Sequence, residues 1–220
     1  MKKLKPVFII IIVVFAGLWA IRLYNGRRFH VEKETRFMMD TYVTIYAVGP
    51  KGITSRAVDL ALGRMQEIDV KFNSLNPKSP IYAFNHNNVP ISDVEILGLV
   101  QIALKASKET GGAFDITVAP LLELWGFYGK SYRVPEEQEI KDCLKKVGYQ
   151  HLSIENGKLT KDNPGTQIDL GGVAKGYALV EAVKVLKAKG VNSALIDSGG
   201  DVFALGKKGK RLWKVGIRNP

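Results

Sequence analysis

Apolar residues recur with two different periods along the chain, and these periods predict strands and helices in an irregular order. Residues 37–48 alternate and are rich in β-branched and aromatic side chains, which predicts a strand that ends at Gly49-Pro50. A hairpin is predicted at residues 152–159, with its turn at Asn156-Gly157. Further strand patterns occupy residues 194–197, 202–205 and 213–217.

The helical repeat, in which apolar residues return every three or four positions, marks four other stretches. Ser92 and Glu95 form a capping-box pattern at the start of the second stretch, which Gly111-Gly112 stop. Pro135 takes a first-turn position in the third. Because strands and helices do not alternate regularly, the predicted fold class is α+β. The predicted helices cover residues 58–72, 92–110, 135–147 and 174–189.

An uncharged apolar run, residues 7–21, lies between lysines at positions 2, 3 and 5 and arginines at positions 22, 27 and 28. Because the run is apolar on every face, residues 1–28 are predicted to be an uncleaved signal anchor rather than a core helix. A cleaved signal peptide is the alternative, although no A-x-A-like site follows the run. The basic flanks give a small preference for a body outside the cytoplasm. That body is predicted to be one domain over residues 35–220.

Composition narrows the chemistry that this domain can perform. The chain has 220 residues, of which 46% are hydrophobic and 24% charged, enough to bury a core. The net charge is +11, but residues 1–36 hold eight Lys or Arg against two Glu and so contribute more than half of it. The charge of the remaining residues is too small to indicate a nucleic-acid-binding surface. One cysteine and three widely separated histidines exclude an intramolecular disulfide and leave little for zinc, Cys-His or Ser-His-Asp chemistry.

The strongest candidate for a site is residues 168–177, where an acid and a glycine pair precede a predicted helix. Gly171 and Gly172 would let a phosphate approach the unpaired amides at the helix N-terminus, and Lys175 could pair with it. Asp169 would repel a phosphate unless a cation bridges them, which favours a Mg²⁺-dependent nucleotide site. A plain strand-to-helix turn, with Asp169 as a cap, fits the spacing equally well.

Two further segments carry candidate residues. Residues 111–120 include Asp115, which on its own would be interpreted as the cap of a helix beginning at Pro120. Residues 197–201 place Gly199 and Gly200 between two predicted strands, which indicates a bulge or a close approach of backbone to a ligand.

Taken together, these segments resemble the ordered motifs of the ApbE family, the FAD:protein FMN transferases. The resemblance covers residues 37–220. Its motifs are Met39-Asp40-Thr41, Ala113-Phe114-Asp115-Ile116-Thr117 with Trp125-Gly126-Phe127, residues 169–177, Ser198-Gly199-Gly200-Asp201, and residues 213–217.

The resemblance implies a mixed sheet with packed helices in an ApbE-like, T-fold-like domain, and an Mg²⁺-dependent enzyme at the outer face of the cytoplasmic membrane. Such an enzyme uses FAD as substrate, transfers FMN onto a threonine hydroxyl of a partner protein and releases AMP. It further implies that the Gly172 carbonyl is a metal ligand. The implied cofactor-binding residues are Met39, Leu75, Ala113, Phe114, Asp115, Asp169 and Lys175.

The sequence departs from the family pattern at three places. Asp40 follows Met39 where the family usually has glycine, and Val180 stands where an acid is expected. The sequence also ends where the family continues into a second half that carries further Mg²⁺ ligands, so the domain is expected to be incomplete. We therefore expect these 220 residues alone to bind FAD without transferring FMN. A non-catalytic FAD-binding remnant, a split half, and a ligand-free extracytoplasmic domain are the alternatives.

Overall fold

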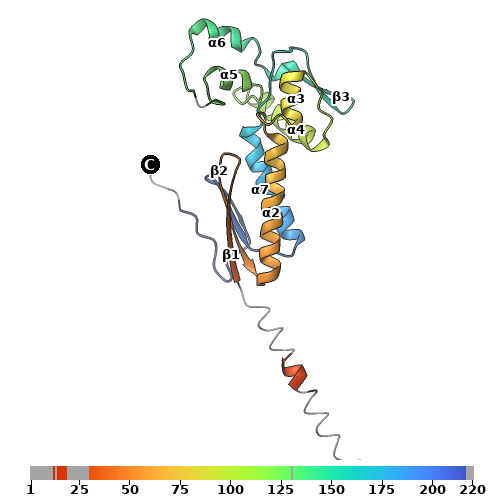
Figure 1. The fold of residues 1–220 in the computed structure, drawn as a ribbon, viewed down its shortest axis with the longest axis vertical. Helices are drawn as coiled ribbons and strands as arrows, with labels where there is room; N and C mark the ends of the chain where they lie inside the picture. Colours follow the sequence, from red (N-terminus) through yellow and green to blue (C-terminus); the bar gives the residue numbers. More distant parts are fainter. Residues whose placement is uncertain (1–11, 13, 19–29, 130, 217–220) are drawn as a thin grey trace, which may run out of the picture. The chain divides into compact units, whose positions relative to one another are not determined.

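A computed structural model describes residues 12, 14–18, 30–129 and 131–216 (Figure 1). The described residues divide into two compact units, one within Met1–Gly63 and Glu181–Pro220 and the other within Arg64–Val180. Two long helices, α2 (Lys51–Phe72) and α7 (Gly171–Ala188), contribute residues to both units.

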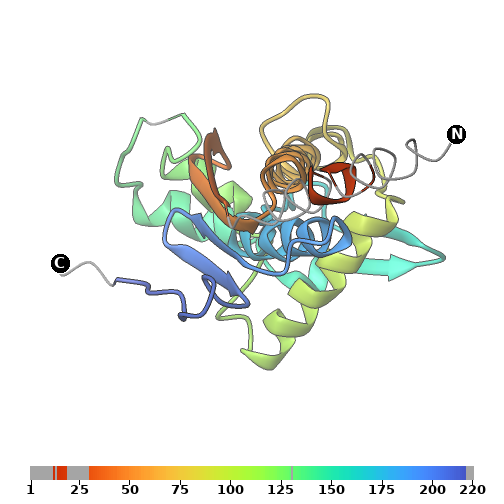
Figure 2. The ribbon, with the colours of Figure 1, turned by 90° about the horizontal axis from the view of Figure 1, so that it is seen from below.

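The first unit is built on a four-stranded sheet in the order β1-β2-β5-β6. The strands are β1 (His30–Met38), β2 (Thr41–Gly49), β5 (Ala194–Ser198) and β6 (Asp201–Leu205), and every pair is antiparallel. The first half of α2 and the second half of α7 lie on one face of this sheet (Figures 1 and 2). The buried side chains of that layer include Val43, Ile45, Ala57, Leu62, Val183, Leu186 and Ile196.

These elements confirm an α+β fold. The resemblance implied a mixed sheet, whereas the strands of the described sheets pair antiparallel. Parallel pairing occurs among the described residues at the isolated bridge between Val118 and Gln167.

The strand predicted over residues 37–48 is two strands joined by a tight turn. Met38 pairs with Thr41, so Met39 and Asp40 alone make the turn. Both have positive φ, 52° and 56°, as a type I′ turn requires. Aspartate is accepted in such a turn, but neither asparagine nor glycine marks this pair, so the alternating pattern was interpreted as continuous.

The strand predicted over residues 213–217 is wrong for its described part, residues 213–216, which have no regular structure. The Trp213 Nε1 donates to the Leu205 carbonyl over 3.2 Å, and Lys208 lies over the same indole ring. The side chain of Trp213 thus contacts the end of β6.

Besides its parts of α2 and α7, the second unit holds four helices and a hairpin among the described residues. The hairpin, β3 (Leu152–Glu155) and β4 (Lys158–Lys161), confirms the predicted turn, since Asn156 and Gly157 both have positive φ. The 3₁₀ turn Tyr149–His151 precedes it. The helices are α3 (Pro80–Asn87), α4 (Val94–Glu109), α5 (Ala119–Leu124) and α6 (Glu137–Leu144).

Helix starts differ from the predicted ones by a few residues. The N-cap of α4 is Asp93, whose Oδ1 accepts from the amides of Glu95 and Ile96, so Ser92 is not the cap. Helix α6 follows a Glu136 N-cap rather than beginning at Pro135. Helix α7 begins at Gly171, three residues before the predicted start, so the glycine pair lies inside its first turn.

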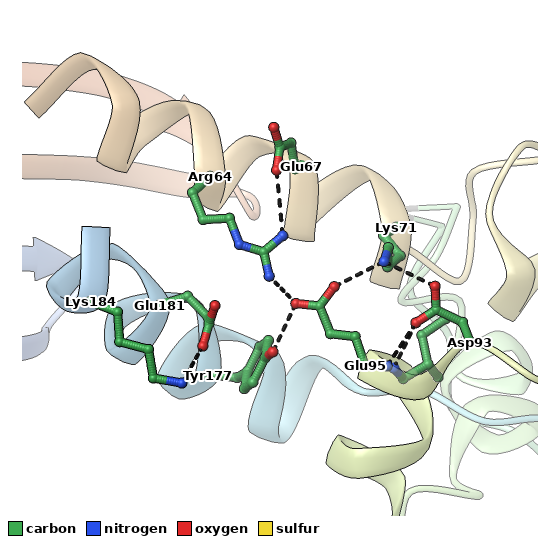
Figure 3. A network of polar contacts seen from close by, with 9 residues as sticks. Arg64, Glu67, Lys71, Asp93, Glu95, Tyr177, Glu181 and Lys184 are labelled. Carbon is green, nitrogen blue, oxygen red and sulfur yellow. Dashed lines mark hydrogen bonds and ion pairs between the residues drawn. The ribbon is translucent and has the colours of Figure 1, made fainter. Parts of the chain in front are cut away.

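A network of charged side chains joins three helices of the second unit (Figure 3). Glu95 of α4 accepts hydrogen bonds from Arg64 and Lys71 of α2 and from the Tyr177 hydroxyl of α7. Lys71 also donates to Asp93. Although burial alone would raise it, the pKa of Glu95 is lowered by these three donors. The carboxylate is therefore the common acceptor that holds the three helices together.

The predicted anchor, residues 1–28, lies largely outside the described residues. Among the residues that the structure does describe, no helix is both long and apolar enough to cross a bilayer.

Candidate functional site

The segment that leads to Asp169 is fixed from two sides within the second unit. The buried Asn85 side chain pairs with the backbone of Ile168, donating to its carbonyl over 2.9 Å and accepting from its amide over 2.8 Å. On the other side, the Asp169 amide donates to the Ile116 carbonyl over 2.8 Å. Because both contacts involve backbone, the position of Asp169 does not depend on the rotamers of its own side chain.

The Asp169 carboxylate itself accepts three hydrogen bonds. Ser74 Oγ and the Tyr128 hydroxyl both donate to Oδ2, over 3.0 and 2.8 Å. The amide of Gly171, the first residue of α7, donates to Oδ1 over 2.7 Å. Asp169 therefore satisfies the first amide of α7, although Leu170, whose carbonyl accepts from Val173 and Ala174, takes the N-cap position. The three contacts also fix the direction of the free lone pairs of the carboxylate.

Ser74, Tyr128 and Asn85 were not found by sequence reasoning. Ser74 follows the end of α2 and is buried, and Tyr128 lies in the loop after α5. Burial and the adjacent Asp169 carboxylate raise the pKa of the Tyr128 phenol well above its ordinary value, so its hydroxyl stays protonated and donates. No local motif identifies these residues, since their partners lie 41 to 95 positions away in the chain.

Gly172 lies against an aromatic ring of the protein. A Cβ at this position would come within 3.1 Å of Cε2 of Phe114. The half-buried Phe114 thus packs on the first turn of α7. A side chain at this position would require the Phe114 ring to shift by a few tenths of an ångström.

Several other predicted cofactor-binding residues belong to the same unit. Leu75 is 49% exposed and adjoins Ser74, and the exposed Ala113 adjoins Phe114. Lys175 lies one turn along α7 from Gly171. The contacts of Ser74 and Phe114 therefore bring the segments of Leu75 and Ala113 to the N-terminus of α7.

The Asp115 carboxylate accepts hydrogen bonds from neighbouring residues. Its Oδ1 accepts from the amide and hydroxyl of Thr117, and its Oδ2 accepts from the amide of Tyr149 over 2.7 Å. The cap of α5 is Val118, with no side-chain hydrogen bond, so the interpretation of Asp115 as a helix cap is wrong. The predicted contact of Asp115 with a cofactor stays a prediction.

Met39 belongs to the other unit, where it forms the β1–β2 turn with Asp40. In that unit, Gly199 and Gly200 make a two-residue hairpin turn between Ser198 and Asp201, not a bulge. Gly199 has a φ of 62°, and a Cβ there would collide with the Thr41 side chain. This close approach of the backbone is to the protein's own β2.

The described residues do not bring three metal-ligating side chains together. Among them, no group of three or more His, Cys, Asp or Glu side chains could hold a metal ion. The Gly172 carbonyl lies in the first turn of α7, where a carbonyl usually accepts from the residue four positions on. It can offer one further lone pair, whereas Mg²⁺ requires an octahedral set of oxygens.

The arrangement is suited to holding a polar ligand. The amides of Val173 and Ala174 donate to the Leu170 carbonyl, and the amide of Gly171 donates to the Asp169 carboxylate. Gly172, between them in the first turn of α7, is exposed to solvent. The start of an 18-residue helix attracts anions through its dipole, and the fixed Asp169 carboxylate attracts hydrogen-bond donors. Phe114 and Leu75 add apolar surface. A nucleotide offers all three kinds of group.

Comparison with known proteins relates residues 39–220 to one protein family. The sequence model of the ApbE family matches residues 39–220. An FAD:protein FMN transferase of Vibrio cholerae is 28% identical over 191 residues, which are 83% of this chain and 57% of that protein. One from Escherichia coli K12 is 33% identical over 138 residues, 60% of this chain and 39% of that protein.

Solved structures show the same fold. The ApbE protein of Thermotoga maritima matches with a TM-score of 0.80 and 34% identity, covering 86% of this chain and 64% of that one. The flavin transferase ApbE of Vibrio cholerae matches with a TM-score of 0.79 and 26% identity, covering 87% and 65%. The chain thus spans about half of these curated relatives and about two thirds of the solved chains.

Proposed function

The chain belongs to the ApbE family, and from this membership we propose that it binds FAD and takes part in transferring its FMN moiety to a protein. The names of the relatives supply the reaction class. The observation that carries the proposal for this chain is the Asp169 carboxylate, held by three donors at the exposed start of α7. We propose this region of the second unit, with Leu75, Ala113, Phe114 and Lys175, as the FAD site, to which Asp115 also contributes. The contact of Met39 with the cofactor stays a separate prediction for the first unit.

In the proposed reaction, a threonine oxygen of the acceptor bonds to the FMN phosphorus. The bond from that phosphorus to the oxygen of AMP breaks, AMP leaves, and the hydroxyl proton is released. The residues of this chain bind and orient: Asp169 accepts from a donor group of FAD, and the start of α7 attracts its phosphates. Lys175, one turn along, supplies positive charge near them.

Magnesium dependence is part of the proposal, with the Gly172 carbonyl as one ligand. Mg²⁺ would neutralise charge on the pyrophosphate. Since the described residues do not complete its coordination, we assign no step to it. FAD binding without transfer by these 220 residues alone is the second candidate function.

We also propose that residues 1–28 anchor the protein in the cytoplasmic membrane and that its folded body works on the extracytoplasmic side. The support is the uncharged run of residues 7–21 between basic flanks. The partner would then be an acceptor flavoprotein at the same membrane face.

Covalent flavin fluorescence on the acceptor tests the proposed function. The purified chain is incubated with FAD, Mg²⁺ and a threonine-bearing acceptor, then separated by denaturing electrophoresis. We expect FAD binding but no fluorescent acceptor from the 220 residues alone, and a fluorescent acceptor once the C-terminal part of a relative is added as a separate chain. Absence of both FAD binding and a fluorescent acceptor in every mixture would overturn the proposal.

A further inference from the structure

The hydrogen bonds of Asp169 are unevenly divided between its two oxygens. A carboxylate accepts about four hydrogen bonds, two at each oxygen. Oδ2 already accepts two, from Ser74 and Tyr128, whereas Oδ1 accepts one, from the Gly171 amide. The remaining acceptor capacity of the side chain therefore lies on Oδ1, next to the exposed glycine turn.

The two donors to Oδ2 come from different parts of the second unit. Ser74 is buried just after α2, and Tyr128 follows α5. The backbone of Asp169 is fixed independently through Ile116. Rotation of the carboxylate would break both hydrogen bonds at Oδ2 together with the one from Gly171. Its orientation is thus set before any ligand arrives.

We propose that Ser74 and Tyr128 are positioning residues, which turn Asp169 so that Oδ1 accepts a hydrogen bond from an N–H or O–H group of the bound flavin nucleotide. The inference rests on the proposed FAD site and deepens it. Neither residue needs to touch the ligand. The site selects for a donor group at this point, because a phosphate or carbonyl oxygen would face an anion that already has its own donors.

The test is a double-mutant cycle on FAD affinity, measured by quenching of flavin fluorescence with the full chain. Tyr128→Phe and Ser74→Ala are each expected to weaken binding about tenfold, because the carboxylate loses a donor and its fixed orientation. In the Asp169→Asn background, Tyr128→Phe is expected to change the affinity less than about twofold. Tyr132→Phe, an exposed tyrosine of the same loop, is the matched control.

A purely structural role of Tyr128 predicts a different cycle. Loosening of the loop would make Tyr128→Phe weaken FAD binding by the same factor in the wild-type and Asp169→Asn backgrounds, and that result would overturn the inference. So would unchanged affinity of both single variants while the wild type binds FAD.

A ligand-free measurement separates this inference from the proposed function. The Gly171 amide donates to Oδ1, so its NMR shift and hydrogen-exchange rate report the carboxylate orientation. We expect several-fold faster exchange in Tyr128→Phe and unchanged exchange in Tyr132→Phe. If the wild type does not bind FAD, the proposed function and the ligand-accepting role of Oδ1 both fall. An unaltered Gly171 amide in Tyr128→Phe would overturn the positioning of Asp169 as well.

Discussion

Single glycines in α7 have different neighbours, although they lie four residues apart. A Cβ on Gly172 would come within 3.1 Å of the Phe114 ring, whereas one on Gly176 would meet nothing within 4 Å. The motif that predicted a close phosphate approach therefore also contains a packing requirement. Loss of ligand binding on substituting Gly172 has two possible causes, and stability measurements separate them.

Gly172→Val is expected to lower the free energy of unfolding by about 1–3 kcal/mol, because the branched side chain displaces Phe114. Gly176→Val in the same helix should change it by less than about 0.5 kcal/mol, since valine and glycine have similar, low helix propensities. Urea denaturation measures both. A Gly172→Val variant as stable as the wild type would show that Phe114 moves aside freely.

Asp40 adopts a left-handed backbone conformation, with a φ of 56°. Asp40→Gly is expected to raise the free energy of unfolding by about 0.5–1 kcal/mol, because glycine has no Cβ to strain there. Asp40→Ala should lower it by about 1 kcal/mol, since alanine tolerates positive φ less well than aspartate. Thermal unfolding compares them, and equal effects of the two substitutions would contradict the strained turn.

Helices α2, α4 and α7 are joined through one carboxylate, that of Glu95 (Figure 3). Its side chain is 17% exposed, so removing its charge leaves Arg64 and Lys71 partly buried without their shared partner. The Tyr177 contact ties the same carboxylate to the helix that begins at the candidate site. Substituting Glu95 should therefore weaken the packing of these three helices, and the free energy of unfolding measures this loss.

Glu95→Gln is expected to lower the free energy of unfolding by about 2 kcal/mol at pH 7. Because the folded pKa of Glu95 lies below its ordinary value of 4.5, its contribution is present above that value and is lost as the pH falls through the folded pKa. The wild type should thus lose more stability than Glu95→Gln as the pH falls below 4.5. Glu67→Gln, an exposed partner of Arg64, should have little effect. Parallel acid profiles for wild type and Glu95→Gln would contradict this role.

The sequence predicted those turns and helix ends whose conformation is favoured by the residues at that position. The turn at Asn156-Gly157 was correct because asparagine and glycine tolerate positive φ. The turn at Met39-Asp40 was missed because its conformation is imposed by the pairing of β1 with β2. At the site, Asp169 and the glycine pair were identified from their motif. Ser74 and Tyr128 meet Asp169 only through tertiary structure, which spacing does not report.

At the scale of the whole molecule, each of the two units carries predicted cofactor-binding residues. Met39 belongs to the first, and the others lie within Arg64–Val180. The contacts of Asp169 and Phe114 are internal to the second unit, so the central part of the proposed site is built by one compact unit. The predicted anchor, residues 1–28, lies before the first described strand, β1.

Deleting residues 1–28 is expected to release the protein from the membrane fraction without changing its fold. The reason is that the apolar run 7–21 precedes the first strand, β1, and is predicted to lie in the bilayer. Fractionation measures the release, and circular dichroism with thermal unfolding measures the fold. Retention of the deleted form in the membrane would contradict the anchor.

FAD titration of the full chain tests the central claim most directly, with Asp169→Asn as the variant and Asp142→Asn, an exposed partner of Lys145, as the control. We predict saturable quenching of flavin fluorescence for wild type and Asp142→Asn. Asp169→Asn should bind at least about tenfold more weakly, because its side chain no longer offers a charged acceptor. Equal affinity of wild type and Asp169→Asn, with both proteins folded, would contradict an FAD site at the start of α7.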